Sequence, residues 1–133
     1  MNKLLPLLIA LGVAVSACES KAPSAEATMG DKWVTVEISN GVIVPDPDPI
    51  PIPRGGHVIH WVIVTDGYTF PDDGITLKDG PNSAITHAHP ANQGKIFQVN
   101  DKNITIEDIR YSIKVNGSPP VPTLDPTIRN QGS

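Results

Sequence analysis

The stretch IRYSIKV, residues 109–115, has the clearest period in the chain, because apolar and polar side chains alternate along its whole length. Successive side chains of a β-strand point to opposite faces of the sheet. Ile109, Tyr111, Ile113 and Val115 are therefore expected to face a core, while the polar residues between them face water. The stretch predicts a strand with one buried face.

Other segments have the same short, strand-like character. Further strands are expected at residues 33–39, 42–44, 57–65, 74–78, 95–99 and 127–130, the last of these at a sheet edge, with a weaker candidate at 104–106. Turn residues such as Asn40-Gly41 separate them, and 14 prolines interrupt the chain too often for long helices. Seven or eight short strands predict an all-β fold, a single antiparallel β-sandwich.

The segment PDPDPIPIPR, residues 45–54, has proline at every second position and so lacks many backbone donors. We interpret it as an extended edge or a polyproline-like crossover that leads into the strand at 57–65. The alternative is a stiff recognition strip for a partner protein.

The N-terminus has the pattern of a secretory signal. Residues 1–17, MNKLLPLLIALGVAVSA, combine the cation Lys3, an apolar run and a small-residue end. Residues 15–18, VSAC, resemble the lipobox of bacterial lipoproteins. The resemblance implies cleavage before Cys18 and acylation of its sulfur, which would hold the chain on a membrane. The alternative is ordinary cleavage after Ala17, which leaves a free thiol.

The predicted organisation therefore has three parts: a lipoprotein signal peptide at 1–17, a lipidated Cys18 with a flexible tether at 18–31, and a β-sandwich domain at 32–131. Glu19 favours sorting to the outer membrane, facing the periplasm. The domain has the size of a single core.

Charge and cysteine content restrict the function. Without Lys3 the chain has 10 − 1 = 9 basic and 14 acidic residues, a net charge of −5, and we expect no nucleic-acid partner. Cys18 is the only cysteine, so we expect neither a disulfide nor a catalytic thiolate in the domain.

The strongest candidate for chemistry is His87-Ala88-His89, within a segment, residues 79–94, that we expect to be a polar loop. In an extended backbone both imidazoles would project to one face and could reach one Zn²⁺ or Cu²⁺ ion. His60, Asp72, Asp73 and Asp79 are candidate third ligands, and the spacing does not select among them. The alternative is a pair of exposed loop histidines.

No motif for catalysis is present in the sequence: it has no G-x-S-x-G, no H-E-x-x-H and no phosphate-binding glycine loop. Asp72-Asp73 stands between Phe70-Pro71 and Gly74, where Asp is typical of a turn. We therefore predict that the protein is not an enzyme.

The domain resembles a group of small bacterial β-domain proteins that bear the label DP-EP family. The resemblance rests on PDPDPIPIP (45–53), GYTFPDDGI (67–75), YSIKV (111–115) and LDPTIRNQ (124–131). It implies a cupredoxin-like or immunoglobulin-like sandwich and no particular activity. The loop VNGSPPVPTL, residues 115–124, lacks the Cys, His and Met of a blue-copper site.

Taken together, these features predict a lipid-anchored, non-catalytic binding module of the bacterial cell envelope. The expected partners are the membrane, through Cys18, and an envelope protein. No resident cofactor is expected. The alternative is a periplasmic zinc- or copper-binding protein that uses His87 and His89.

Overall fold

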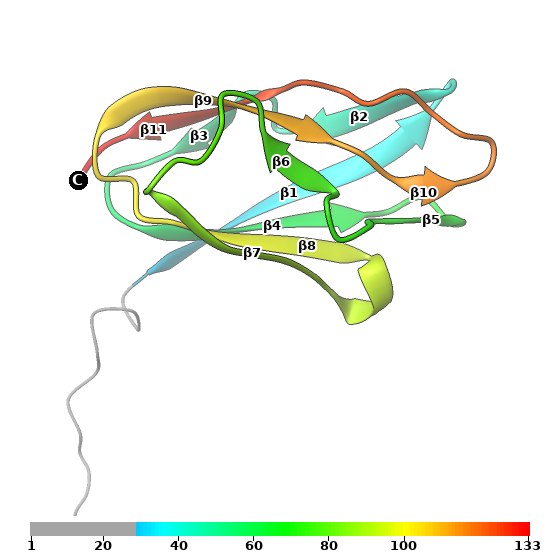
Figure 1. Ribbon diagram of the computed structural model, residues 1–133, viewed down its shortest axis with the longest axis horizontal. Coiled ribbons are helices and arrows are strands. Elements are labelled where there is room, and N and C mark those ends of the chain that lie inside the picture. Colours follow the sequence, from blue (N-terminus) through cyan, green and yellow to red (C-terminus); the bar gives the residue numbers. More distant parts are fainter. Residues whose placement is uncertain (1–28) are drawn as a thin grey trace, which may run out of the picture.

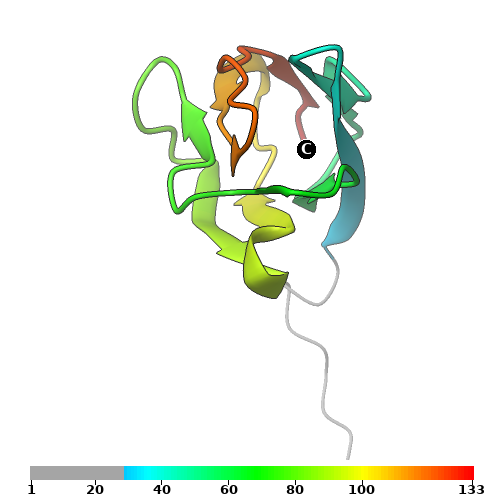
Figure 2. The same cartoon turned by 90° about the vertical axis from the view of Figure 1, so that its right-hand side faces the viewer.

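The computed structural model describes residues 29–133, in which β-strands form two main sheets packed face to face as a sandwich. Figure 1 shows β4, β8 and β7 in one layer and β3, β11 and β9 in the other, and Figure 2 views the same layers from one end. The strands are β1 (Gly30–Ser39), β2 (Val42–Asp46), β3 (Ile50–Ile52), β4 (His57–Ile63), β5 (Tyr68–Thr69), β6 (Ile75–Leu77), β7 (Ile85–Ala91), β8 (Ile96–Asp101), β9 (Ile106–Ile113), β10 (Asn116–Gly117) and β11 (Thr127–Gln131).

The five-stranded sheet has the order β2-β1-β4-β8-β7, and the four-stranded sheet has the order β3-β11-β9-β6. The short strands β5 and β10 pair separately. The only helix in the described part of the chain is a 3₁₀ turn, η3, at Asn92–Gly94. No helix among residues 29–133 has the length and apolar character needed to cross a membrane.

The all-β sandwich predicted from the sequence is confirmed, with two differences in detail. The described residues form eleven strands rather than seven or eight. In addition, β1 runs parallel to β4 and β3 runs parallel to β11, so the sheets are mixed rather than purely antiparallel. Parallel neighbours need a crossover connection. Here the proline-rich segment supplies it, because the chain leaves β2, forms β3 at the edge of the other sheet, and returns to β4 beside β1.

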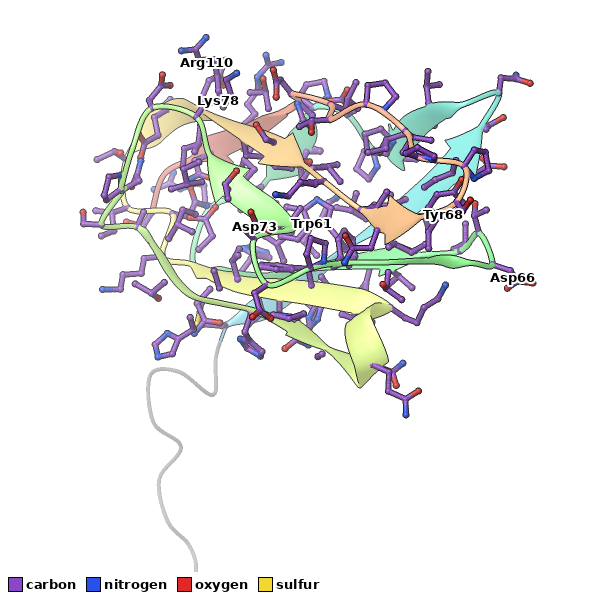
Figure 3. The ribbon with its side chains drawn as sticks, turned by 45° about the vertical axis from the view of Figure 1, so that its right-hand side comes forward. Trp61, Asp66, Tyr68, Asp73, Lys78 and Arg110 are labelled. Atoms are coloured by element: carbon purple, nitrogen blue, oxygen red, sulfur yellow. The ribbon has the colours of Figure 1, made fainter. Side chains whose placement is uncertain are left out.

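The core lies between the sheets and consists of aromatic and β-branched side chains. Its largest fully buried members are Trp61, Tyr111 and Phe97, and Trp61 lies between the two layers (Figure 3). Ile109, Tyr111 and Ile113 are buried as their alternation predicted. The indole Nε1–H of Trp61 donates to the Tyr111 hydroxyl at 3.1 Å, which joins the two sheets through their side chains.

Three strands lie where the sequence predicted none: β7, inside the predicted polar loop, and the two-residue strands β5 and β10. β3 falls inside the proline-rich segment and lies at the edge of its sheet, in agreement with the interpretation of that segment as an extended edge. β7 is the edge strand of its sheet, and its central residues are exposed, so it has no apolar alternation to reveal it. β11 was predicted as an edge strand, but it lies between β3 and β9.

The borders of the domain also shift slightly. β1 begins at Gly30, two residues before the predicted start of the domain at Lys32, so the last two residues of the predicted tether belong to a strand. The signal peptide and Cys18 lie outside the described residues.

Candidate functional site

His87 and His89, the predicted metal pair, lie on β7 at a bulge. The β7–β8 register shifts between Thr86 and His89, and His87 has a left-handed backbone with φ of 58°. The simple extended geometry that would point both imidazoles to one face is therefore interrupted at His87. Both side chains are exposed.

Hydrogen bonds orient both rings. His89 Nδ1 lies 2.8 Å from the carbonyl oxygen of His87, so this nitrogen donates and Nε2 is left as the acceptor. His87 Nδ1 lies 3.1 Å from the Thr86 hydroxyl and 3.4 Å from the amide nitrogen of Asn100. An imidazole that binds a metal is usually oriented by a hydrogen bond from its other ring nitrogen to a carbonyl or carboxylate oxygen.

The candidate third ligands do not join this pair. His60 is held by other partners, Asp79 pairs with Arg110, and Asp73 pairs with Lys114. Across residues 29–133, no three His, Cys, Asp or Glu side chains gather closely enough to share a metal ion. Of the predicted metal ligands, only the imidazoles of His87 and His89 on β7 are left as candidates.

The outer face of the five-stranded sheet carries a row of side chains that the sequence alone did not reveal. Trp33 on β1 is opposite His60 on β4, His60 is opposite Gln98 on β8, and Gln98 is opposite His89 on β7. Directly opposite residues share a face. Because Ile59 and the other alternate residues of β4 point into the core, this row faces outward. We call these four residues the cross-strand row.

An aromatic stack forms one end of the cross-strand row. The rings of Trp33 and His60 are nearly parallel, with an interplanar angle of 10° and centroids 4.0 Å apart. Trp33 is 54% exposed, whereas His60 is only 8% exposed. The indole therefore covers the imidazole on one side and presents its own remaining surface to solvent.

Both ring nitrogens of His60 are fixed. Nε2 lies 2.9 Å from a carboxylate oxygen of Asp31, and Nδ1 lies 3.0 Å from the side-chain nitrogen of Gln98. A neutral ring with its hydrogen on Nε2 satisfies both contacts, because it donates to Asp31 and accepts from Gln98. The imidazole is held at two points, and it in turn fixes the indole that stacks on it.

The outer face of the four-stranded sheet is different in kind, because exposed ion pairs cover it. Arg110 and Lys78 point away from the body on this side (Figure 3). Hydrogen bonding to Arg110 lowers the pKa of Asp79, and hydrogen bonds from Ser112 and Lys78 lower that of Asp125. Each of these charges already has an opposite partner, so this face offers little unpaired charge to a ligand.

One buried polar cluster lies near the end of β8. Asp101 is fully buried, and one of its carboxylate oxygens accepts from the backbone N–H of Asn103 and from the amide of Asn130. The other oxygen of Asp101 and the amide oxygen of Asn130 are buried with no hydrogen-bond partner among the described residues. Burial raises the pKa of Asp101.

Trp33 is the residue that sequence reasoning passed over. It stands on the polar face of its strand, in phase with Thr35 and Glu37 and out of phase with the buried Val34 and Val36. An indole on the water-facing side of an alternating strand is a signal that could have marked this face. The partners that fix it come from β4 and β8, which the sequence does not place beside it.

No family model matches the chain, and no curated protein matches it either. The resemblance to the DP-EP group therefore stays a prediction.

Proposed function

We propose that this protein is a non-catalytic binding module of the bacterial cell envelope, held through lipid on Cys18 at the outer membrane and facing the periplasm. Three features support the proposal: the signal-like residues 1–17, the lipobox-like VSAC at 15–18, and the distance of 12 residues between Cys18 and the first strand at Gly30. An extended link of that length reaches about 40 Å, enough to hold a small domain clear of a bilayer.

The observation that carries the binding role is the fixed, half-exposed Trp33. An exposed indole usually has rotational freedom, and side-chain ordering costs free energy. Here the His60 stack and the two hydrogen bonds of His60 order the ring in advance. A surface that is ordered before its ligand arrives binds with a smaller entropic cost.

The anchor is tested by Cys18→Ser in the full-length chain expressed in a Gram-negative host. We expect the parent protein to take up labelled fatty acid and to sediment with outer membranes, and the variant to do neither. Thr35→Ser, an exposed change within β1, serves as the matched control and should behave as the parent does. Unlabelled protein, or a Cys18→Ser variant that still sediments with membranes, would remove the anchor from the proposal.

A second candidate function is zinc or copper binding by His87 and His89. The favouring observation is the 2.8 Å contact from His89 Nδ1 to a backbone carbonyl, which leaves Nε2 free to bind an ion. Both rings are exposed on the edge strand β7, so an ion reaches them without any rearrangement of the core.

A further inference from the structure

We infer that the first half of β1, residues 30–34, is a site for strand addition, where an extended segment of a partner protein pairs with the sheet and continues the line of β2. We call residues 30–34 the open edge. The added segment runs antiparallel to β1, with an apolar side chain opposite Trp33 and a basic side chain opposite Asp31. This inference rests on the proposed binding role and names the chemistry of the partner. It does not depend on the lipid at Cys18.

The open edge exists because β2 lies beside only the later half of β1 (Figure 1). The β1–β2 register begins at Thr35, which is opposite Asp46, and from there the chain leaves for β3 in the other sheet. Within residues 29–133, the only strand that pairs with the open edge is β4, on the opposite side. The side that faces away from β4 therefore has no neighbouring strand in the described part of the chain.

The β1–β2 register indicates which backbone groups face this free side. Pro45, which has no backbone N–H, is opposite Val36, so these two do not form a hydrogen-bonded pair. The N–H and C=O groups of the next residue, Thr35, face β2 instead. Backbone groups alternate in direction along a strand, so those of Trp33 and Asp31 face the same side as those of Thr35.

The hydrogen bonds of the intervening residues agree with this direction. The Val36 carbonyl accepts from the N–H of Val64, and the Gly30 N–H donates to the Gly56 carbonyl, at 3.0 Å each. Val64 and Gly56 flank β4, so the even-numbered residues of β1 face β4. The two odd-numbered residues of the open edge have no backbone hydrogen bond to any described residue on the other side. They present two donors and two acceptors, which is what an added strand needs.

The other edges of the two sheets have features that oppose strand addition. Pro45 lies in β2, Pro51 in β3 and Pro90 in β7, and β7 also has the bulge at His87. β6 has only three residues. Prolines, bulges and short strands are common ways of protecting a sheet edge. The open edge has no proline, and its register with β4 continues without a break, so among the described strands it is the edge left available for pairing.

The free face of the Trp33 indole is on the same side as these backbone groups. His60, on β4, stacks on one face of the ring, so the other face is directed away from β4 and toward the position of an added strand. Residues that are directly opposite in a sheet share a face. A side chain opposite Trp33 would therefore pack against the exposed indole, and an apolar, β-branched side chain suits this position because it buries area against the ring.

Charge specifies the next two positions of the added segment. Asp31 is on the same face as Trp33 with 63% of its side chain exposed, and Asp46 and Asp48, where the chain leaves β2, are also exposed. An Arg or Lys opposite Asp31 would form a cross-strand ion pair. On the other face, Lys32 favours an acidic residue between these two positions. The complementary segment therefore has the order apolar, acidic, basic from its N-terminus.

A second copy of this chain fits the open edge poorly. Two open edges related by a twofold axis would pair antiparallel, with Asp31 opposite Trp33 of the other copy and Lys32 opposite its own equivalent. Like charges that are directly opposite destabilise a pair of strands. A partner segment with an acidic residue opposite Lys32 avoids this repulsion.

The test uses the isotopically labelled full-length chain in detergent micelles and the peptide acetyl-Thr-Val-Glu-Arg-Thr-amide, whose Val, Glu and Arg are designed to lie opposite Trp33, Lys32 and Asp31. Hydrogen exchange followed by NMR measures each amide separately. In the free chain we expect the N–H groups of Asp31 and Trp33 to exchange rapidly, and those of Lys32 and Val34, which face β4, to be protected. At a peptide concentration of about ten times Kd, exchange at Asp31 and Trp33 should slow about tenfold.

N-methylated peptides separate strand addition from side-chain contact and leave the protein unaltered. In the antiparallel alignment, the Val and Arg of the peptide form backbone hydrogen bonds with β1, while the N–H of Glu points away from it. N-methylation of Val or of Arg should therefore abolish binding. N-methylation of Glu is the matched control and should largely preserve binding. The reverse pattern would contradict the antiparallel alignment.

A peptide of the same composition tests the charge assignment. Acetyl-Thr-Val-Arg-Glu-Thr-amide places Arg opposite Lys32 and Glu opposite Asp31, and it should bind at least about threefold more weakly because like charges are then opposite on both faces. Equal binding of the two peptides would contradict the charge assignment.

Variants of the protein test the two sides of the site. Asp31→Pro removes an N–H that faces the free side and leaves the bonds to β4 intact, so it should abolish binding. Asp31→Asn keeps this N–H and should weaken binding only about two- to fivefold, through the lost charge. Trp33→Ala should weaken binding at least about tenfold, as loss of a central aromatic contact does. Val64→Ala, an exposed apolar change beyond the open edge, is the matched control and should bind as the parent does.

Three outcomes would overturn the inference: the peptide leaves exchange at Asp31 and Trp33 unchanged, all methylated peptides bind equally, or Asp31→Pro binds as well as Asp31→Asn. Protection of these two amides in the free chain would also overturn it. Such protection would assign the edge to residues 1–28 if it is independent of protein concentration, and to a second copy if it rises with concentration. An acylated Cys18 without peptide binding removes only this inference, and peptide binding with a bare Cys18 removes only the anchor.

Discussion

Trp61 and Tyr111 belong to opposite sheets and are joined by a hydrogen bond of 3.1 Å from the indole Nε1–H to the phenol oxygen. Their rings lie 5.4 Å apart at an interplanar angle of 55°. Neither side chain is exposed to solvent. The pair therefore fixes how the two sheets face each other, in addition to the apolar area that it buries. Burial also raises the pKa of Tyr111, so the phenol stays neutral and keeps its proton.

Tyr111→Phe should destabilise the domain by about 1–3 kcal/mol, because the buried N–H of Trp61 would lose its acceptor. Urea unfolding followed by tryptophan fluorescence measures the change in the free energy of unfolding. Tyr68→Phe is the comparison, since its hydroxyl donates to the Pro119 carbonyl at a partly buried site. A Tyr111→Phe variant as stable as the parent would mean that Nε1 finds another acceptor.

Asp101→Asn should be at least as stable as the parent at pH 7 and should lose a pH dependence that the parent shows. Burial raises the pKa of Asp101 in the folded state, with Glu107 raising it further, while hydrogen bonds from Asn103 and Asn130 act in the opposite direction. The folded state therefore binds this proton more tightly than the unfolded state. The contribution of Asp101 to stability is complete below the unfolded value of 3.8 and is lost as pH rises through the folded pKa.

The measurement for Asp101 is the difference in unfolding free energy between parent and variant from pH 3 to pH 7. The difference isolates Asp101 from Asp73, Asp79 and Asp125, whose lowered pKa values give the opposite slope: their contribution is present above 3.8 and is lost as pH falls. Each unit of pKa shift corresponds to about 1.4 kcal/mol. A difference that does not change with pH would contradict this assignment.

Gly117→Ala should be more damaging than Gly41→Ala. Both glycines have positive φ, but a Cβ on Gly117 would run into the Tyr68 ring and the carbonyl of Gly67, while a Cβ on Gly41 meets nothing. We expect a loss of about 1 kcal/mol at Gly41 from backbone strain alone and about 3 kcal/mol at Gly117, where overpacking adds to it. Thermal unfolding of the two variants side by side tests the order, and equal losses would show that Tyr68 moves aside.

Zinc and copper titrations examine the second candidate function. If the imidazoles of β7 hold an ion, calorimetry should give binding tighter than about 1 mM, and the double variant His87→Ala/His89→Ala should abolish it. His57→Ala is the control, since its Nδ1 is bound to the Gly55 carbonyl and it lies on β4. Binding that persists in the double variant would remove this candidate.

The strands with strict alternation were determined by the sequence. Ile109, Tyr111 and Ile113 of β9 and Val34 and Val36 of β1 are buried, and the residues between them are not. This pattern is local, because side chains of a strand alternate whatever its neighbours are. The proline-rich segment was likewise recognisable as extended chain at sheet edges, because proline has no backbone N–H to donate to a neighbouring strand.

The neighbours of each strand were decided only by the tertiary structure. Pairing joins residues far apart in the chain, and nothing in the period of β1 or β4 states that they lie side by side in parallel. The stack of Trp33 on His60, and the alignment of Gln98 and His89 with it, exist only through that pairing. A period is a property of one strand, whereas a binding face is built from several. The sequence therefore determined the sandwich, and the packing of its strands decided the site.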